Sequence, residues 1–102
     1  MTYNELKEKL SEKIPSLHFN SQRYYISLRK KRNFAFLKIR KKKIRLIAML
    51  NEEIIREKMK KHEIITLTES VQKFYNGPCA GIEIIDNKNL DEIIDLLVEI
   101  QA

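Results

Sequence analysis

The strongest constraint on the fold is the hydrophobic pattern between residues 24 and 50, which repeats every second residue. Apolar and polar side chains alternate in three runs, over residues 24–29, 34–40 and 44–50, with short polar breaks between them. This period is typical of β-strands, and breaks of this length let consecutive strands pair as hairpins. The pattern predicts an antiparallel β-meander of three strands.

A helix is expected before the meander. Thr2 and Glu5 have the spacing of a capping box, and apolar residues then recur at helical spacing until Pro15 interrupts them. The pattern predicts a helix over residues 3–14. Residues 16–22 are mainly polar, and we expect them to form a connector.

The segment after the meander is expected to contain a short helix, two strands and a helical turn. Asn51 and the two glutamates after it favour a helix start, which predicts a helix over about residues 52–61. Residues 63–67 and 82–85 have strand patterns, and residues 68–75 are expected to form the helical turn.

The last element is expected to be an amphipathic helix. Asn89 is its predicted cap, with Glu92 at the third position. Its apolar side chains share one face, which we expect to pack on the sheet. The whole pattern predicts a single α+β domain over residues 1–102: an N-terminal helix, the three-stranded antiparallel meander, a short helix, two further strands and the C-terminal helix.

The charge of the chain is divided sharply along the sequence. Twelve lysine and arginine residues and no acidic residue lie between Glu12 and Glu52, whereas the rest of the chain has fourteen acidic and eight basic residues. Ten of these cations fall within residues 29–45, which we call the basic meander. A basic surface of this kind attracts polyanions, so nucleic acid is an expected partner. The predicted nucleic-acid-binding residues are Arg29, Lys30, Lys31, Arg32, Lys38, Arg40, Lys41, Lys42, Lys43 and Arg45.

Aromatic residues interrupt the basic meander. In the second run, Ala35 and Leu37 share one strand face, while Phe34 and Phe36 share the other face with cations. If the aliphatic face forms the core, the rings are exposed beside positive charge, a combination that binds single-stranded nucleic acid. The candidate stacking residues are Tyr25, Phe34 and Phe36.

Other interpretations of the basic meander remain open. If both sheet faces are buried, Phe34 and Phe36 belong to the core, and the lysines of the turns are solvated guards against edge pairing. The acidic C-terminal helix can also lie against the basic sheet, in the same chain or in a second copy. The alternative function is therefore a protein-interaction or homodimerisation module whose basic sheet pairs with an acidic surface.

Residues suited to catalysis or metal binding are few and scattered. His18 and His62 lie in different elements without a motif, and Cys79 is the only cysteine, so the spacing predicts no zinc site and no nucleophile–base pair. Glu52 and Glu53 occupy a helix start, where acidic residues have an ordinary electrostatic role. We expect no catalytic residue, no metal ligand and no cofactor, and we expect that the protein is not an enzyme.

The compartment is also suggested by composition. No apolar run approaches the roughly 18 residues of a membrane span, and the first residues indicate a helix start rather than a signal peptide. A single cysteine fits a reducing compartment. We expect a cytoplasmic protein without membrane contact.

The stretch YYISLRKKRNFAFLKIRKKKIRLIAML, followed by a short helix, a later strand and a terminal LDEII helix, resembles a family of small prokaryotic domains of unknown function. Members of that family occur alone or at the carboxyl end of larger proteins, some with restriction-endonuclease-like domains and some labelled as predicted transport proteins. The similarity covers about residues 4–101. The resemblance implies the fold and supplies no catalytic residues. We therefore expect a non-catalytic accessory domain that binds nucleic acid with low sequence specificity through the basic meander.

Overall fold

The computed structural model describes residues 2–41 and 43–101 of the 102-residue chain, without the side chain of Thr2. The predicted capping box depends on that side chain and lies outside the described residues. The elements follow in the order α1 (Thr2–Lys13), β1 (His18–Ser21), β2 (Ile26–Arg29), β3 (Asn33–Ile39), β4 (Ile44–Ala48), α2 (Glu52–Lys58), β5 (Glu63–Ile65), α3 (Glu69–Phe74), β6 (Ala80–Ile84) and α4 (Leu90–Gln101).

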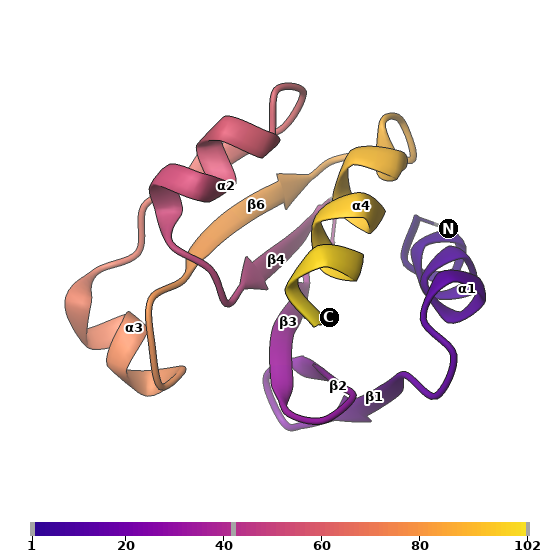
Figure 1. Cartoon of the computed structure of the whole chain (residues 1–102), viewed down its shortest axis with the longest axis horizontal. Coiled ribbons are helices and arrows are strands. Elements are labelled where there is room, and N and C mark those ends of the chain that lie inside the picture. Colours follow the sequence, from indigo (N-terminus) through magenta and orange to yellow (C-terminus); the bar gives the residue numbers. More distant parts are fainter. Residues whose placement is uncertain (1, 42, 102) are drawn as a thin grey trace.

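The strands form a six-stranded antiparallel sheet in the order β1-β2-β3-β4-β6-β5 (Figure 1). The predicted α+β class is confirmed. The meander has four strands rather than three, because the expected connector contains β1, which places Phe19 opposite Leu28 of β2. Phe19 also packs against the main core, so one apolar side chain holds this short polar segment in the sheet.

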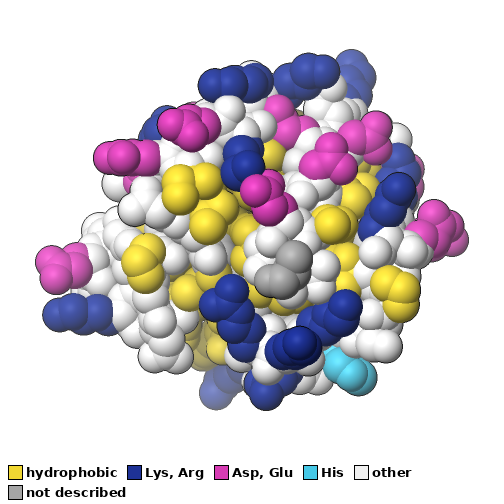
Figure 2. Space-filling view, in the orientation of Figure 1, with side chains coloured by type: hydrophobic (Ala, Val, Ile, Leu, Met, Phe, Trp, Pro, Cys, Tyr) yellow, Lys and Arg dark blue, Asp and Glu magenta, His cyan; other side chains and the backbone are white. Residues whose placement is uncertain are grey.

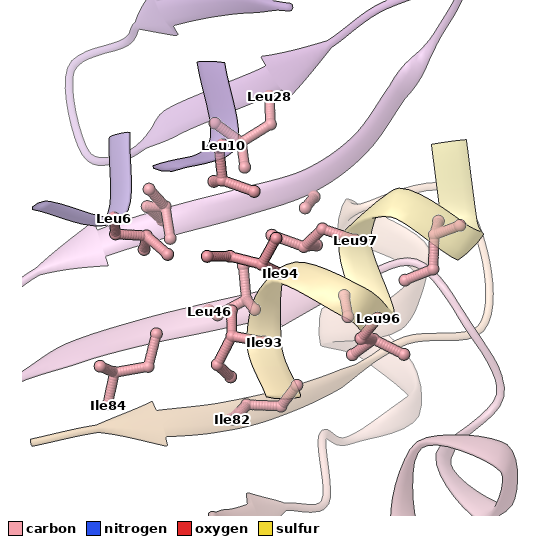
Figure 3. Packing of buried hydrophobic residues seen from close by; sticks show 14 of the residues in the cluster. Leu6, Leu10, Leu28, Leu46, Ile82, Ile84, Ile93, Ile94, Leu96 and Leu97 are labelled. Carbon is pink, nitrogen blue, oxygen red and sulfur yellow. The ribbon is translucent and has the colours of Figure 1, made fainter. Parts of the chain in front are cut away.

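One face of the sheet is covered by helices, and we call it the helix face. α1 and α4 lie side by side on it, and α2 packs next to α4 (Figure 1). Burial of each large apolar side chain contributes about 1.5–3 kcal/mol, so this layer is the main source of stability. The close view in Figure 3 shows how side chains from the helices meet those from the strands: Leu6, Leu10, Leu28, Leu46, Ile82, Ile84, Ile93, Ile94, Leu96 and Leu97.

The opposite face, which we call the open face, is covered in part by α3 and the segments around it. A smaller buried cluster lies there, made of Phe36, Ile47, Tyr75 and Cys79. Tyr25 packs against its border and stays partly exposed. Beyond this cluster, the open face presents charged side chains of the central and edge strands.

Phe34 and Phe36 are both core residues. Phe34 is 1% exposed and belongs to the main core, and Phe36 is 5% exposed and belongs to the smaller cluster. Phe34 does not follow the alternation of side chains between the two sheet faces. The register between β2 and β3 shifts after Leu28, so that Leu28 pairs with Ala35, Arg29 pairs with Asn33, and Phe34 lies between these two pairs. The prediction that these two rings are exposed stacking platforms is therefore wrong.

The two predicted asparagine caps have different outcomes. Asn51 caps α2 as expected, since its Oδ1 accepts a hydrogen bond from the backbone N–H of Glu53 at 2.9 Å. Asn89 instead has φ of 60°, a left-handed conformation that precedes α4. Glu92 does not complete a capping box, because its carboxylate accepts hydrogen bonds from the loop that precedes β5.

Candidate nucleic-acid interface

The cations of the basic meander form two groups rather than one patch. Lys30, Lys31 and Arg32 lie in the turn between β2 and β3, just after Arg29 at the end of β2, and Arg40, Lys41 and Lys43 lie between β3 and β4. Successive turns of a meander lie at opposite ends of the sheet, and the length of β3 separates these two by about 20 Å. Lys42 lies outside the described residues.

The first group surrounds a cavity at the end of α4. This cavity of about 300 Å³ is lined by Lys30, Lys31, Arg32, Phe34 and Gln101. All three cations are exposed. Figure 2 shows Lys and Arg side chains gathered at the bottom of the view, with no Asp or Glu among them. This end of the molecule therefore has a strongly positive surface.

The second group is less uniform. Arg40 and Lys41 are exposed, and the backbone N–H of Arg40 donates to the carbonyl oxygen of Lys43 at 2.9 Å, which closes the turn. Lys43 is also exposed, but its Nζ lies 3.8 Å from Glu83 Oε1. Arg40 and Lys41 are thus the cations of this turn that point to solvent without a described acidic partner.

Arg45 has a structural role. Its Nε donates to Glu83 Oε1 at 2.9 Å, and its Nη2 donates to the same oxygen. The Arg45 side chain is 24% exposed and the Glu83 side chain is 3% exposed, so the pair is largely withdrawn from water. The charge of Arg45 offsets that of a buried carboxylate, which leaves little of it for a phosphate.

A row of charges crosses the open face next to this pair. Lys38 lies opposite Arg45, Arg45 opposite Glu83, and Glu83 opposite Glu63. Two cations are therefore followed by two acids from β3 to β5. The positive potential of this face therefore lies on its β3 side, where Lys38 forms no ion pair with a described acidic side chain.

Exposed aromatic rings lie on or near this positive side. Tyr25 packs against Phe36 with ring centroids 5.3 Å apart, and its ring is also 6.4 Å from that of Phe74. Phe74, at the end of α3, is 66% exposed. Tyr24 is exposed as well, with the guanidinium of Arg23 5.3 Å from its ring centroid. Sequence reasoning selected Tyr25 and missed Phe74, which lies within the expected helical turn of residues 68–75 and has no pattern that marks it as exposed.

Two of the four acidic side chains of α4, those of Glu92 and Glu99, bind groups of α2 and the loop after it. Glu99 pairs with Lys58 of α2 at 2.8 Å. Glu92 accepts hydrogen bonds from the backbone N–H groups of Lys60 and Lys61, and it lies 2.7 Å from Nδ1 of His62. In the described part of the chain, α4 thus compensates basic groups around α2 and not the basic meander.

The remaining titratable groups have structural surroundings. Burial raises the pKa of the Cys79 thiol, which favours the unreactive thiol form. Hydrogen bonds from Arg56 and Thr66 hold the pKa of Glu52 below its usual range. His62 lies in the loop before β5, where its side chain is 7% exposed and faces Glu92.

Two further properties bear on function. Within residues 2–41 and 43–101, no group of three or more His, Cys, Asp or Glu side chains is placed to hold a metal ion. Among the same residues, no helix combines the length and apolar character needed to cross a membrane.

Comparison with known proteins supports the expected membership of an uncharacterised family. No curated protein and no solved structure matches the chain. A family model described as a domain of unknown function, DUF5655, matches residues 1–99. Since this match covers nearly the whole chain, the protein belongs to the DUF5655 family of domains.

Proposed function

We propose that this domain is a non-catalytic accessory module that binds nucleic acid with low sequence specificity through the exposed cations of the basic meander. The supporting observation is the charge arrangement at its two turns. Lys30, Lys31 and Arg32 surround a cavity at one end of β3, and Arg40 and Lys41 project at the other. The acids of α4 that form ion pairs do so elsewhere, with α2 and the loop that follows it.

The spacing of the two turns fits a polyanion better than a small anion. Along one strand of a duplex, phosphates follow every 3.4 Å or so, so about 20 Å corresponds to roughly six phosphates. A nucleic acid that lies along β3 can therefore reach both turns. Lysine and arginine side chains on turns contact phosphate and carry no base information, which accounts for the low specificity.

The biological setting proposed here follows from composition and resemblance. A cytoplasmic location agrees with the single cysteine, which is buried. The resemblance to prokaryotic domains that accompany restriction-endonuclease-like domains suggests a module that holds nucleic acid for a partner enzyme. In this proposal the domain needs no cofactor and performs no chemistry itself.

The test is fluorescence anisotropy with labelled single-stranded DNA, duplex DNA and RNA over a range of salt concentrations. The variant Lys31→Glu/Lys41→Glu reverses one charge at each turn. The control Lys9→Glu/Lys13→Glu reverses two exposed charges on α1, which covers the helix face, so net charge changes equally. We expect wild-type affinity to fall as salt rises, with a slope of about −0.7 to −0.9 per phosphate contact.

The turn variant should bind at least tenfold more weakly at low salt, and the α1 control should bind within about twofold of the wild type, because direct phosphate contact requires the cations at their positions. An equal loss of affinity in both variants would show that binding depends on the net charge of the protein and not on the positions of the turn cations. Absence of wild-type binding at low salt would disprove the proposed function.

A second candidate function is a protein-interaction or homodimerisation module, and the outer side of α4 favours it. Asp91 and Asp95 are exposed there, where Figure 2 shows acidic side chains, and they complement the basic turns in charge. This candidate predicts a dimer that dissociates as ionic strength rises. Sedimentation equilibrium at low and high salt measures this dissociation, with Asp91→Lys/Asp95→Lys as the charge-reversed variant. A wild-type protein that is monomeric at every salt concentration would exclude the homodimer.

A further inference from the structure

The open face carries an aromatic pair beside Lys38. Tyr25 precedes Ile26, whose partner Leu37 precedes Lys38, so Tyr25 and Lys38 are neighbours across β2 and β3. The Tyr25 ring makes an edge contact with Phe74, with centroids 6.4 Å apart and planes at 89°. Two rings at right angles, next to a lysine and close to a basic turn, combine the two contacts that unpaired nucleotides need.

We infer that this surface selects single-stranded nucleic acid, with a base stacked on the exposed ring of Phe74 beside Tyr25 and the backbone held by Lys38, Arg40 and Lys41. The inference rests on the proposed function and adds its substrate class. Phe74 is 66% exposed although it is a large apolar ring, and no part of the described chain covers it further. A stacked base would remove that ring from water.

The aromatic pair is held in place by the residues beneath and beside it. The ring centroid of Tyr25 lies 5.3 Å from that of Phe36 and 6.1 Å from that of Tyr75. The ring centroid of Phe74 lies 5.0 Å from that of Tyr75. Phe36 and Tyr75 are themselves buried. Rings fixed in this way lose little conformational freedom when a ligand binds, which favours affinity.

The charges of the open face determine where the strand lies. Lys38 attracts phosphate on the β3 side, Arg45 and Glu83 offset each other in the middle of the face, and Glu63 repels phosphate on the β5 side. The backbone is therefore expected to follow β3 from the Arg40–Lys43 turn toward Phe74. Duplex DNA keeps its bases stacked inside the helix, so it can use the basic turns but not the rings.

The test compares binding of a labelled twelve-nucleotide oligothymidine and a twelve-base-pair duplex to the full chain by anisotropy at fixed low salt. Phe74→Ala removes the exposed ring and Phe74→Tyr retains it. Ile85→Ala is the matched control, because Ile85 is 70% exposed and lies directly after β6, on the acidic side of the sheet. Circular dichroism checks that each variant is folded.

We expect Phe74→Ala to weaken oligothymidine binding about 5- to 100-fold, the range measured when a stacked base loses its ring. Duplex affinity should change less than twofold, and Phe74→Tyr and Ile85→Ala should both retain wild-type affinity for the single strand. If Phe74→Ala leaves oligothymidine binding unchanged while Lys31→Glu/Lys41→Glu still weakens both ligands, single-strand selection is wrong and the proposed function stands. If neither oligothymidine nor the duplex binds the wild type, both the proposed function and the single-strand selection are wrong.

Discussion

Arg45 and Glu83 bind each other across β4 and β6, with Arg45 Nε 2.9 Å from Glu83 Oε1. The two residues are 38 positions apart in the sequence, and their pairing places a nearly buried carboxylate within the sheet. Gly81, two residues before Glu83 in β6, lies beside the arginine: a Cβ there would make an ordinary contact with Arg45 Cδ at 3.5 Å and a tight one with Ile65 Cβ at 3.3 Å. The pair is thus built into the packing of the open face.

Replacement of Glu83 by alanine is expected to lower the free energy of unfolding by about 1–3 kcal/mol, since Arg45 loses its partner but stays in part hydrated. Urea denaturation measures this loss. The double variant Arg45→Met/Glu83→Met removes both charges and should recover most of the lost stability. A double variant no more stable than Glu83→Ala would show that the ion pair is not what the single variant lost.

The loop from Lys60 to His62 depends on ionised Glu92. Burial raises the pKa of Glu92, but hydrogen bonds from His62 and from the N–H groups of Lys60 and Lys61 outweigh this effect, so its pKa lies below the usual value of 4.5. A lowered pKa means that the carboxylate stabilises the fold at neutral pH, and that this contribution is lost as pH falls below about 4.5.

Glu92→Gln is therefore expected to be less stable than the wild type at pH 7, with a difference that shrinks as the pH is lowered to 3. Urea denaturation at pH 7, 5, 4 and 3 provides the comparison. Asp91→Asn serves as the control, because Asp91 is exposed at the same helix end. A stability difference between Glu92→Gln and the wild type that stays constant with pH would contradict the role of the ionised carboxylate.

The side chain of Asn51, which caps α2, contributes to the stability of the fold. Asn51 Oδ1 accepts the N–H of Glu53, one of the backbone donors that a helix start leaves unpaired. Asn51→Ala should lower the free energy of unfolding by about 1 kcal/mol, while Asn51→Ser keeps an acceptor and should retain most of the stability. Thermal or chemical denaturation distinguishes them, and identical losses would indicate that backbone conformation matters here rather than the cap.

Tyr75 buries a hydroxyl that has no hydrogen-bond partner among the described residues. Burial also raises its pKa, so the phenol remains protonated at neutral pH. Tyr75→Phe removes the unpaired polar atom and keeps the ring that packs on Phe36, so its free energy of unfolding should equal or exceed that of the wild type by up to about 1 kcal/mol. A loss greater than this on denaturation would mean that the hydroxyl is paired in solution.

The sequence predicted those parts of the fold that depend on local patterns. The period-two runs that contain β2, β3 and β4 and the amphipathic stripe of α4 are confirmed, because each is specified by neighbouring residues. β1 was missed because a four-residue edge strand with one core-facing ring, Phe19, has almost no period of its own. Its pairing depends on β2, which periodicity does not describe.

In the candidate site, too, the sequence indicated the features that depend on neighbouring residues and missed those that depend on distant ones. The exposure of the four described lysines of the two turns, Lys30, Lys31, Lys41 and Lys43, agrees with the sequence, since runs of like charge stay solvated. The burial of Phe34 follows from a register shift, and the neutralisation of Arg45 follows from a partner 38 residues away. Neither relationship is local, so composition and spacing suggested more exposed aromatic and basic groups than the structure has.

The position of β6 has a consequence for how the chain acquires its fold during synthesis. β1 to β4 are joined by short turns and can form in order, but β4 then has a free edge until residues 80–84 pair with it. β5 precedes β6 in the chain and pairs with no other strand of the described residues, so it cannot join the sheet before β6. The nascent meander therefore leaves the ribosome with an unpaired edge and an apolar face that α1 covers only in part, and the domain becomes resistant to aggregation only when β5, β6 and α4 have been made.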